Sequence, residues 1–107
     1  MKLSENPIII TLDLYGCKYA YDIHQRIKET FDFPDWYGRN WSAFDDLLYA
    51  PGEYTVVQIR GYNTLPKSIA PYCVTMIEIF EKKRKYYEEI SKKQDNWKIR
   101  FDYKIID

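Results

Sequence analysis

The sequence predicts a small α/β protein in which a three-stranded parallel sheet packs against helices. Strand-like segments lie near the start, the middle and the end of the chain, and segments with helical spacing of apolar residues separate them. Strands separated by helices favour parallel pairing through right-handed crossovers. The chain has 107 residues, of which 46% are hydrophobic, so it can bury a core of its own. We therefore expect a single domain over residues 1–107.

The three expected strands have different patterns. The first lies in "PIIITLDLYG", residues 7–16, where three consecutive isoleucines, residues 8–10, are typical of a strand covered on both faces. The second is "YTVVQIR", residues 54–60. The third is "WKIRFDYKII", residues 97–106, where apolar and charged residues alternate. This alternation predicts an edge strand with one solvated face.

Helices are expected between these strands. The first is "YAYDIHQRIKETF", residues 19–31, with apolar residues at helical spacing. A second should run from Trp41 to Leu48 or Tyr49, with Asn40 as its N-cap. Between the second and third strands, a short helix after Thr64 is followed by a long helix over residues 71–90.

The second helix has two chemically different sides. The side expected in the core holds Trp41, Phe44 and Leu48, with Leu47 at its margin. The opposite side holds Ser42, Asp45, Asp46 and Tyr49. Neither aspartate has a basic residue four positions away on this helix, and Asp46 lies near the C-terminus, where the helix dipole disfavours an anion. This favours a role for the aspartates in binding another molecule, although they could also serve only solubility.

The loop "DWYGRN", residues 35–40, adds large aromatic side chains next to the acidic side. Gly38 permits a turn that other residues resist. We expect Tyr37 to be buried beneath the loop and Trp36 to be exposed, as an aromatic residue at a protein interface would be.

Charge is balanced overall but uneven along the chain. The sequence has 16 basic and 16 acidic residues, yet residues 32–53 have a net charge of −4 and residues 81–104 a net charge of +4. Such asymmetry can steer a charged partner, and two ordinary solvated faces would give the same pattern.

The residues do not indicate an enzyme, a metal site or a cofactor site. Asp45 and Asp46 are sequence neighbours on a helix and point about 100° apart. The single histidine, His24, is expected at the surface or partly buried rather than as a catalytic base. Glycine-rich phosphate loops and the common hydrolase motifs are absent from the sequence. Cys17 and Cys73 have no zinc-like spacing and are expected to be buried free thiols.

Nucleic acid and membrane are not expected partners. The segment "EKKRKYYEEISKK", residues 81–93, could contact RNA, but its interspersed glutamates favour a solvated helix side. No apolar run reaches the length of a membrane span, and the N-terminal segment does not resemble a secretory signal. We expect a cytoplasmic protein that is monomeric when free.

The segment "FPDWYGRNWSAFDDLL", residues 33–48, resembles the barstar family, the bacterial intracellular inhibitors of secreted ribonucleases. Its motif is Pro-x-aromatic-Tyr-Gly-x-Asn between two helices. The similarity is strongest over residues 23–59, which include "IHQRIKETF" and "EYTVVQI", and returns weakly at "MIEIFEKKRK", residues 76–85. The resemblance implies a three-stranded parallel sheet with helices, no catalytic activity, and an immunity or antitoxin role.

The resemblance also implies a binding site. In this family the second helix and the preceding loop enter the basic active-site groove of the ribonuclease and place carboxylates where substrate phosphate would lie. Asp46 matches the central aspartate. Together with residues on the same face, the implied partner-binding set is Trp36, Gly38, Asn40, Ser42, Asp45, Asp46, Tyr49 and Ala50.

Several positions depart from the family pattern. Ser42 stands where the family has a second interface aspartate, and Asp45 and Pro51 stand where it has tryptophans. Lys82 falls near an interface glutamate of the last helix. Asp46 therefore remains, with Asp45 as a candidate replacement for a lost acid. Two functions stay open: inhibition of a cognate ribonuclease, and a regulatory or assembly module with a non-nuclease partner.

Overall fold

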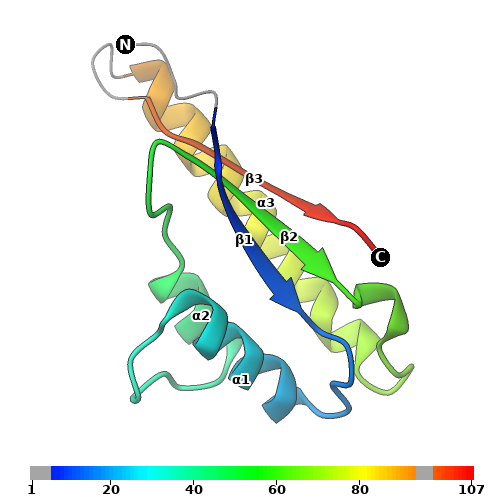
Figure 1. Ribbon diagram of the computed structural model, residues 1–107. Helices are drawn as coiled ribbons and strands as arrows, with labels where there is room; N and C mark the ends of the chain where they lie inside the picture. Colours follow the sequence, from blue (N-terminus) through cyan, green and yellow to red (C-terminus); the bar gives the residue numbers. More distant parts are fainter. Residues whose placement is uncertain (1–5, 94–97) are drawn as a thin grey trace.

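The computed structural model describes residues 6–93 and 98–107 and has a three-stranded parallel sheet (Figure 1). The strands are β1 (Ile8–Asp13), β2 (Tyr54–Arg60) and β3 (Arg100–Ile105). They lie in the order β1-β2-β3, so β2 is central. The predicted α/β fold with a parallel sheet is confirmed.

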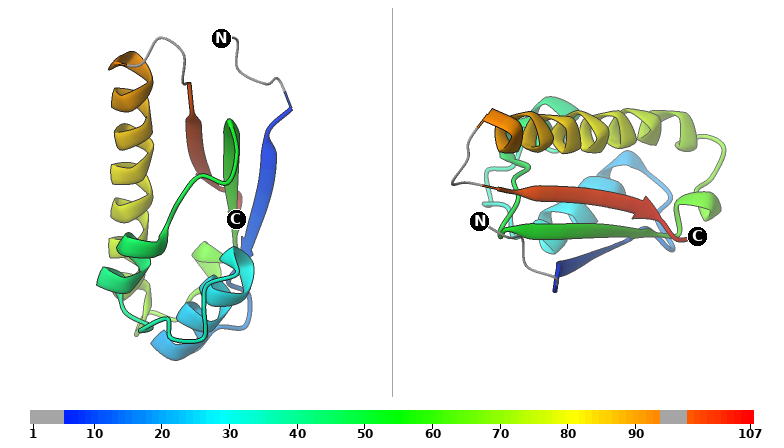
Figure 2. Two further views of the ribbon diagram at one scale, coloured as in Figure 1. Left: turned by 90° about the vertical axis from the view of Figure 1, so that its left-hand side faces the viewer. Right: turned by 90° about the horizontal axis from the view of Figure 1, so that it is seen from above.

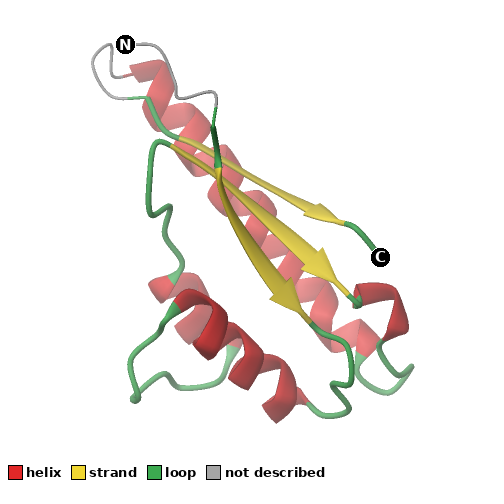
Figure 3. Cartoon of the chain, viewed as in Figure 1, coloured by secondary structure: helices red, strands yellow, loops and turns green. Residues whose placement is uncertain are grey.

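Three α-helices and a short 3-10 helix connect the strands (Figure 3). They are α1 (Ala20–Phe31), α2 (Trp41–Leu47), the 3-10 helix Tyr62–Thr64, and α3 (Ala70–Lys93). The short helix predicted after Thr64 was placed wrongly, because the 3-10 turn ends at that residue and a further turn starting at Pro66 precedes α3.

The α-helices cover one face of the sheet (Figure 2). In β2, Thr55, Val57 and Ile59 point into the core and are fully buried. Of the alternate residues, Val56 is 9% exposed, Gln58 is half-buried and Arg60 is exposed, so the other face of the sheet is partly open to solvent.

The β1 strand differs from the prediction. We expected cover on both faces, but Ile8 and Ile9 are 45% and 49% exposed. Within the described ranges β1 pairs only with β2 and has helices on a single side, which leaves its isoleucines partly solvated. The prediction that β3 is an edge strand is confirmed. Its predicted first residue, Trp97, lies outside the described residues.

Both cysteines are buried and unbonded, as predicted. Burial raises the pKa of both thiols, that of Cys73 to about 11. They are therefore protonated, packed side chains near neutral pH. No helix within residues 6–93 or 98–107 has the length and apolar character needed to cross a membrane.

Candidate protein-binding site

The loop between α1 and α2 begins with a sharp change of direction. Asp32 adopts a left-handed conformation (φ 54°, ψ 46°), which aspartate tolerates better than most residues. The next N–H, that of Phe33, donates to the Lys28 carbonyl at 3.0 Å, and the Tyr37 N–H donates to the Pro34 carbonyl at 2.9 Å. These bonds end α1 and fold the loop back towards the core.

Two buried rings hold the loop down on either side of an exposed one. Phe33 and Tyr37 are buried, with their ring centroids 5.1 Å apart. Tyr37 is only 2% exposed, whereas Trp36 is 75% exposed. The predicted division between the two residues is confirmed, and the Trp36 ring is available for contact with another molecule.

A buried polar cluster lies beneath the loop. His24, only 1% exposed, hydrogen-bonds through Nδ1 to the Tyr37 hydroxyl and through Nε2 to the Tyr72 hydroxyl, both at 2.7 Å. The prediction of a surface or partly buried histidine was therefore wrong. The two hydroxyl partners make full burial tolerable, and Tyr72 lies 48 residues away, beyond any local pattern.

The environment of His24 keeps its ring neutral. Burial, followed by the nearby Arg39 guanidinium, lowers the pKa of His24 to about 4. In the neutral ring one nitrogen donates and the other accepts, so each hydroxyl has a complementary partner. The cluster links α1, the loop and α3 without any buried charge on the histidine.

The inward side of α2 is attached to the same region. Phe44 and Leu48 are buried, and the half-buried Trp41 donates its Nε1–H to the Tyr72 carbonyl at 3.1 Å. Just after the helix, the Ala50 N–H donates to the Tyr87 hydroxyl of α3 at 3.0 Å. The core side predicted for this helix is confirmed, and the helix is fixed at both ends.

Asn40 caps α2 as predicted. Its Oδ1 accepts the Ala43 N–H at 2.8 Å, and its Nδ2 donates to the Gly38 carbonyl at 3.2 Å. The left-handed residue of this turn is Arg39 (φ 51°) rather than Gly38, contrary to the role we assigned to the glycine. A Cβ on Gly38 would lie 3.1 Å from Asn40 Nδ2, so the position is limited by close approach.

The predicted partner-binding residues lie on the loop, on the outward side of α2 and just after it. Six are exposed: Trp36, Gly38, Asn40, Ser42, Asp46 and Tyr49. Asp45 and Ala50 are half-buried. Asp46 makes no hydrogen bond and no ion pair with another described residue. Its carboxylate thus faces solvent on a helix that is held firmly from below.

Asp45 differs from its neighbour, because α3 supplies it with a cation. Lys82 Nζ lies 2.6 Å from Asp45 Oδ2, with the two side chains 67% and 28% exposed. The two aspartates were predicted to be alike, because the prediction considered only basic residues on the same helix. A cleft of about 350 Å³ lies here and is lined by Asp45, Asp46, Lys82, Lys83 and Tyr86.

The remaining charges keep the loop side negative. Arg39, the single basic residue between residues 32 and 53, donates to Gln25 Oε1 at 3.0 Å and stacks over the Tyr21 ring at 5.1 Å. It is therefore held against α1 and not beside Asp46. Asp35 approaches Lys28 at 3.2 Å but stays fully exposed. No three His, Cys, Asp or Glu side chains gather as a metal site within the described ranges.

Comparison with protein families supports the resemblance seen in the loop and α2. A family model described as "Barstar (barnase inhibitor)" matches residues 8–102. The chain belongs to the barstar family. The match spans β1 through the first half of β3 and includes the whole candidate site. A comparison with curated proteins gave no match.

Membership in the barstar family defines the general role. The family consists of inhibitors and not of enzymes, so it supports a barnase-inhibitor-like role in general. It gives no identity for the partner.

Proposed function

We propose that this barstar-family protein inhibits a cognate bacterial ribonuclease by inserting α2 and the loop of residues 32–40 into the enzyme's basic active site. The observation that supports this most strongly is Asp46, an exposed carboxylate that has no partner among the described residues and lies on a capped helix. A partner can bind this carboxylate without first breaking an ion pair, and its negative charge is complementary to a cationic groove.

Asp46 would occupy the place of a substrate phosphate. An ionised carboxylate accepts several hydrogen bonds from Arg, Lys or His, and such charge-assisted bonds are among the strongest in proteins. The buried Phe44 below and the Asn40 cap fix the helix before binding. Little conformational entropy is then lost when the complex forms.

Aromatic side chains would supply the rest of the anchoring surface. Trp36 and Tyr49 are the exposed aromatic residues of the loop and the end of α2. Aromatic residues of this kind often dominate binding energy at the centre of an interface. The small residues Gly38, Ser42 and Ala50 would allow the partner's backbone to approach closely.

A non-nuclease partner is the second candidate. Ser42 replaces an acid of the family pattern, and the ion pair between Asp45 and Lys82 neutralises another carboxylate of the face. A less acidic face suits a less basic partner. The same fold can serve different partners, so only the identity of the bound protein distinguishes the two functions.

Affinity capture from native lysate and culture medium of the source cells tests the proposal. The wild-type chain should retain a protein with ribonuclease activity and should suppress that activity when both are mixed at equal concentration. Asp46→Ala should retain much less of it, whereas Lys104→Gln, on the open face of β3, should behave as wild type. A retained partner without nuclease activity would favour the second candidate.

A further inference from the structure

We infer that Lys82 is a specificity residue that selects a ribonuclease with a carboxylate on the rim of its basic groove and disfavours a groove that is basic throughout. The inference rests on the proposed function, because it concerns the partner of the same face. It starts from the cleft between α2 and α3, where charges of both signs lie together.

Lys82 reduces the negative charge of α2 while remaining at the surface. Its ammonium is 2.6 Å from Asp45, yet its side chain is 67% exposed. A partner that covers the cleft would therefore meet both members of the pair. Asp45 is not a free carboxylate that could replace a missing acid of the family pattern.

Lys83 extends the positive side of the cleft. Its ammonium lies 5.5 Å from the centre of the Tyr86 ring, and Tyr86 is exposed. Among the described residues, Lys83 has no carboxylate within ion-pair distance. The cleft is thus negative at Asp46, balanced at Asp45 and Lys82, and positive at Lys83.

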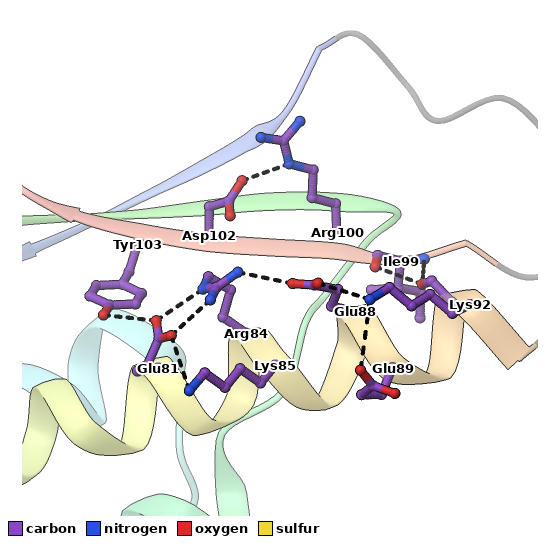
Figure 4. Close-up of polar contacts among 11 residues, drawn as sticks. Glu81, Arg84, Lys85, Glu88, Glu89, Lys92, Ile99, Arg100, Asp102 and Tyr103 are labelled. Atoms are coloured by element: carbon purple, nitrogen blue, oxygen red, sulfur yellow. Dashed lines mark hydrogen bonds and ion pairs between the residues drawn. The ribbon is translucent and has the colours of Figure 1, made fainter.

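The next basic residues of α3 do not share this arrangement. Arg84 is bonded to Glu81 and Glu88, and Lys85 lies 3.8 Å from Glu81 (Figure 4). Their charges are balanced within α3. Lys82 and Lys83 are therefore the cations of this stretch that a partner seated on Asp46 would encounter.

The spatial order of charges across the cleft defines which partner surface is complementary to it. A groove that presents cations to Asp46 and continues as a cationic wall would bring like charges together at Lys82, which disfavours binding. A carboxylate on that wall would instead accept hydrogen bonds from the ammonium groups. Specificity through repulsion of the wrong partner is a common device at interfaces.

Barnase is a suitable probe, since the family is described as its inhibitor. We would measure the affinity of barnase for wild type, Lys82→Gln, Lys82→Glu and the matched charge reversal Lys104→Glu, by calorimetry and by inhibition of RNA hydrolysis. Lys82→Glu should bind at least roughly tenfold more tightly than wild type, because a repulsive charge becomes attractive. Lys82→Gln should fall between them, and Lys104→Glu should equal wild type.

Two comparisons keep this inference separate from the proposed function. Asp46→Ala added to Lys82→Glu should bind barnase more weakly than Lys82→Glu alone; equal affinities of these two variants would contradict the role of Asp46 and with it the proposed function. Equal affinities of wild type, Lys82→Glu and Lys104→Glu, including no detectable binding by any of them, would overturn the role of Lys82. In that case the effect of Asp46→Ala on the captured ribonuclease would still decide the proposed function.

Discussion

The acidic residues of α3 and of α2 are used in opposite ways. On α3, Glu81 accepts from Arg84 Nε and Nη2 at 2.9 and 2.7 Å and from the Tyr103 hydroxyl at 3.1 Å (Figure 4). The pKa of Glu81 is lowered to about 2, chiefly by the hydrogen bonds from Arg84. On α2, Asp46 has no such partner within the described chain.

The difference shows which charges the fold itself uses. Spacings of three and four residues along the long helix α3 bring acids and bases together, as stability alone would favour. The short helix α2 has no basic residue, and Arg39 just before it points towards α1. An acid left unpaired beside such well-paired ones is a local conflict of the kind expected at functional sites.

The largest effect is expected from removing the Asp46 carboxylate, which tests whether the unpaired acid of α2 contributes to binding and the paired acids of α3 do not. Asp46→Ala should weaken binding to the cognate ribonuclease by at least about 2 kcal/mol, because the partner's cations would lose their anion. Thermal unfolding should be unchanged, since Asp46 makes no hydrogen bond or ion pair with any residue of the ranges 6–93 and 98–107. The matched control is Glu88→Ala on α3, which should leave affinity as in wild type; equal affinities for wild type and Asp46→Ala in calorimetry would end the role of Asp46.

The cluster under the loop gives a pH-dependent prediction. The folded-state pKa of His24, about 4, is below the ordinary value of 6.5, so the unfolded chain binds the proton more readily. Stability from His24 is therefore complete above pH 6.5, is lost as pH falls through the window from 6.5 to 4, and changes no further below it. The loss between pH 7 and 5 should be roughly 1–2 kcal/mol.

Urea unfolding at pH 7, 6 and 5 checks this, with His24→Gln as the comparison. The variant should be less stable at pH 7 but should lack the loss contributed by the histidine. A wild-type stability that stays constant across this range would contradict a neutral, buried His24.

The salt dependence of the association rate should differ between variants that lack an acid of α2 and variants that lack an acid of α3. Raising ionic strength should slow association with the ribonuclease far more than it changes dissociation, because long-range attraction between exposed charges is screened. Asp46→Asn should flatten the salt dependence of the association rate in stopped flow. Glu88→Gln should flatten it less, since Glu88 is already paired with Arg84 and Lys92. An identical slope for the two variants would show that pairing within α3 does not matter for steering.

The smallest expected effect concerns Glu81 itself. Because its folded pKa is depressed to about 2 from 4.5, the stability it contributes is present above pH 4.5 and is lost as pH falls towards 2. Glu81→Gln should reduce the acid sensitivity of unfolding in that range and leave ribonuclease affinity unchanged. A changed affinity at neutral pH would place Glu81 in the binding site and would contradict the view that the paired acids of α3 do not take part in binding.

Features that depend on neighbouring residues could be predicted from the sequence. The parallel sheet followed from strand and helix periodicities, the cap from Asn40 before α2, and the opposite exposures of Trp36 and Tyr37 from their place in the loop. The cap and the loop exposures depend on residues within one or two turns of chain, and the parallel pairing followed from the order of strands and helices.

Features that depend on distant contacts could not be predicted. His24 gains its second hydroxyl partner from Tyr72, and Asp45 gains Lys82 from 37 residues away. The exposure of Ile9 follows from the sheet having helices on one side only, which the strand's own pattern does not encode. The family resemblance predicted where the binding site lies, whereas the ion pair in its cleft could be found only from the fold.

The most direct measurement is competition for the ribonuclease between this protein and a nucleoside 3′-monophosphate. If Asp46 occupies the place of a substrate phosphate, the apparent dissociation constant of the wild-type chain should rise in proportion to the nucleotide concentration once the enzyme is saturated with nucleotide. An apparent dissociation constant that does not change with nucleotide would show that the two bind at separate places, and would contradict the account.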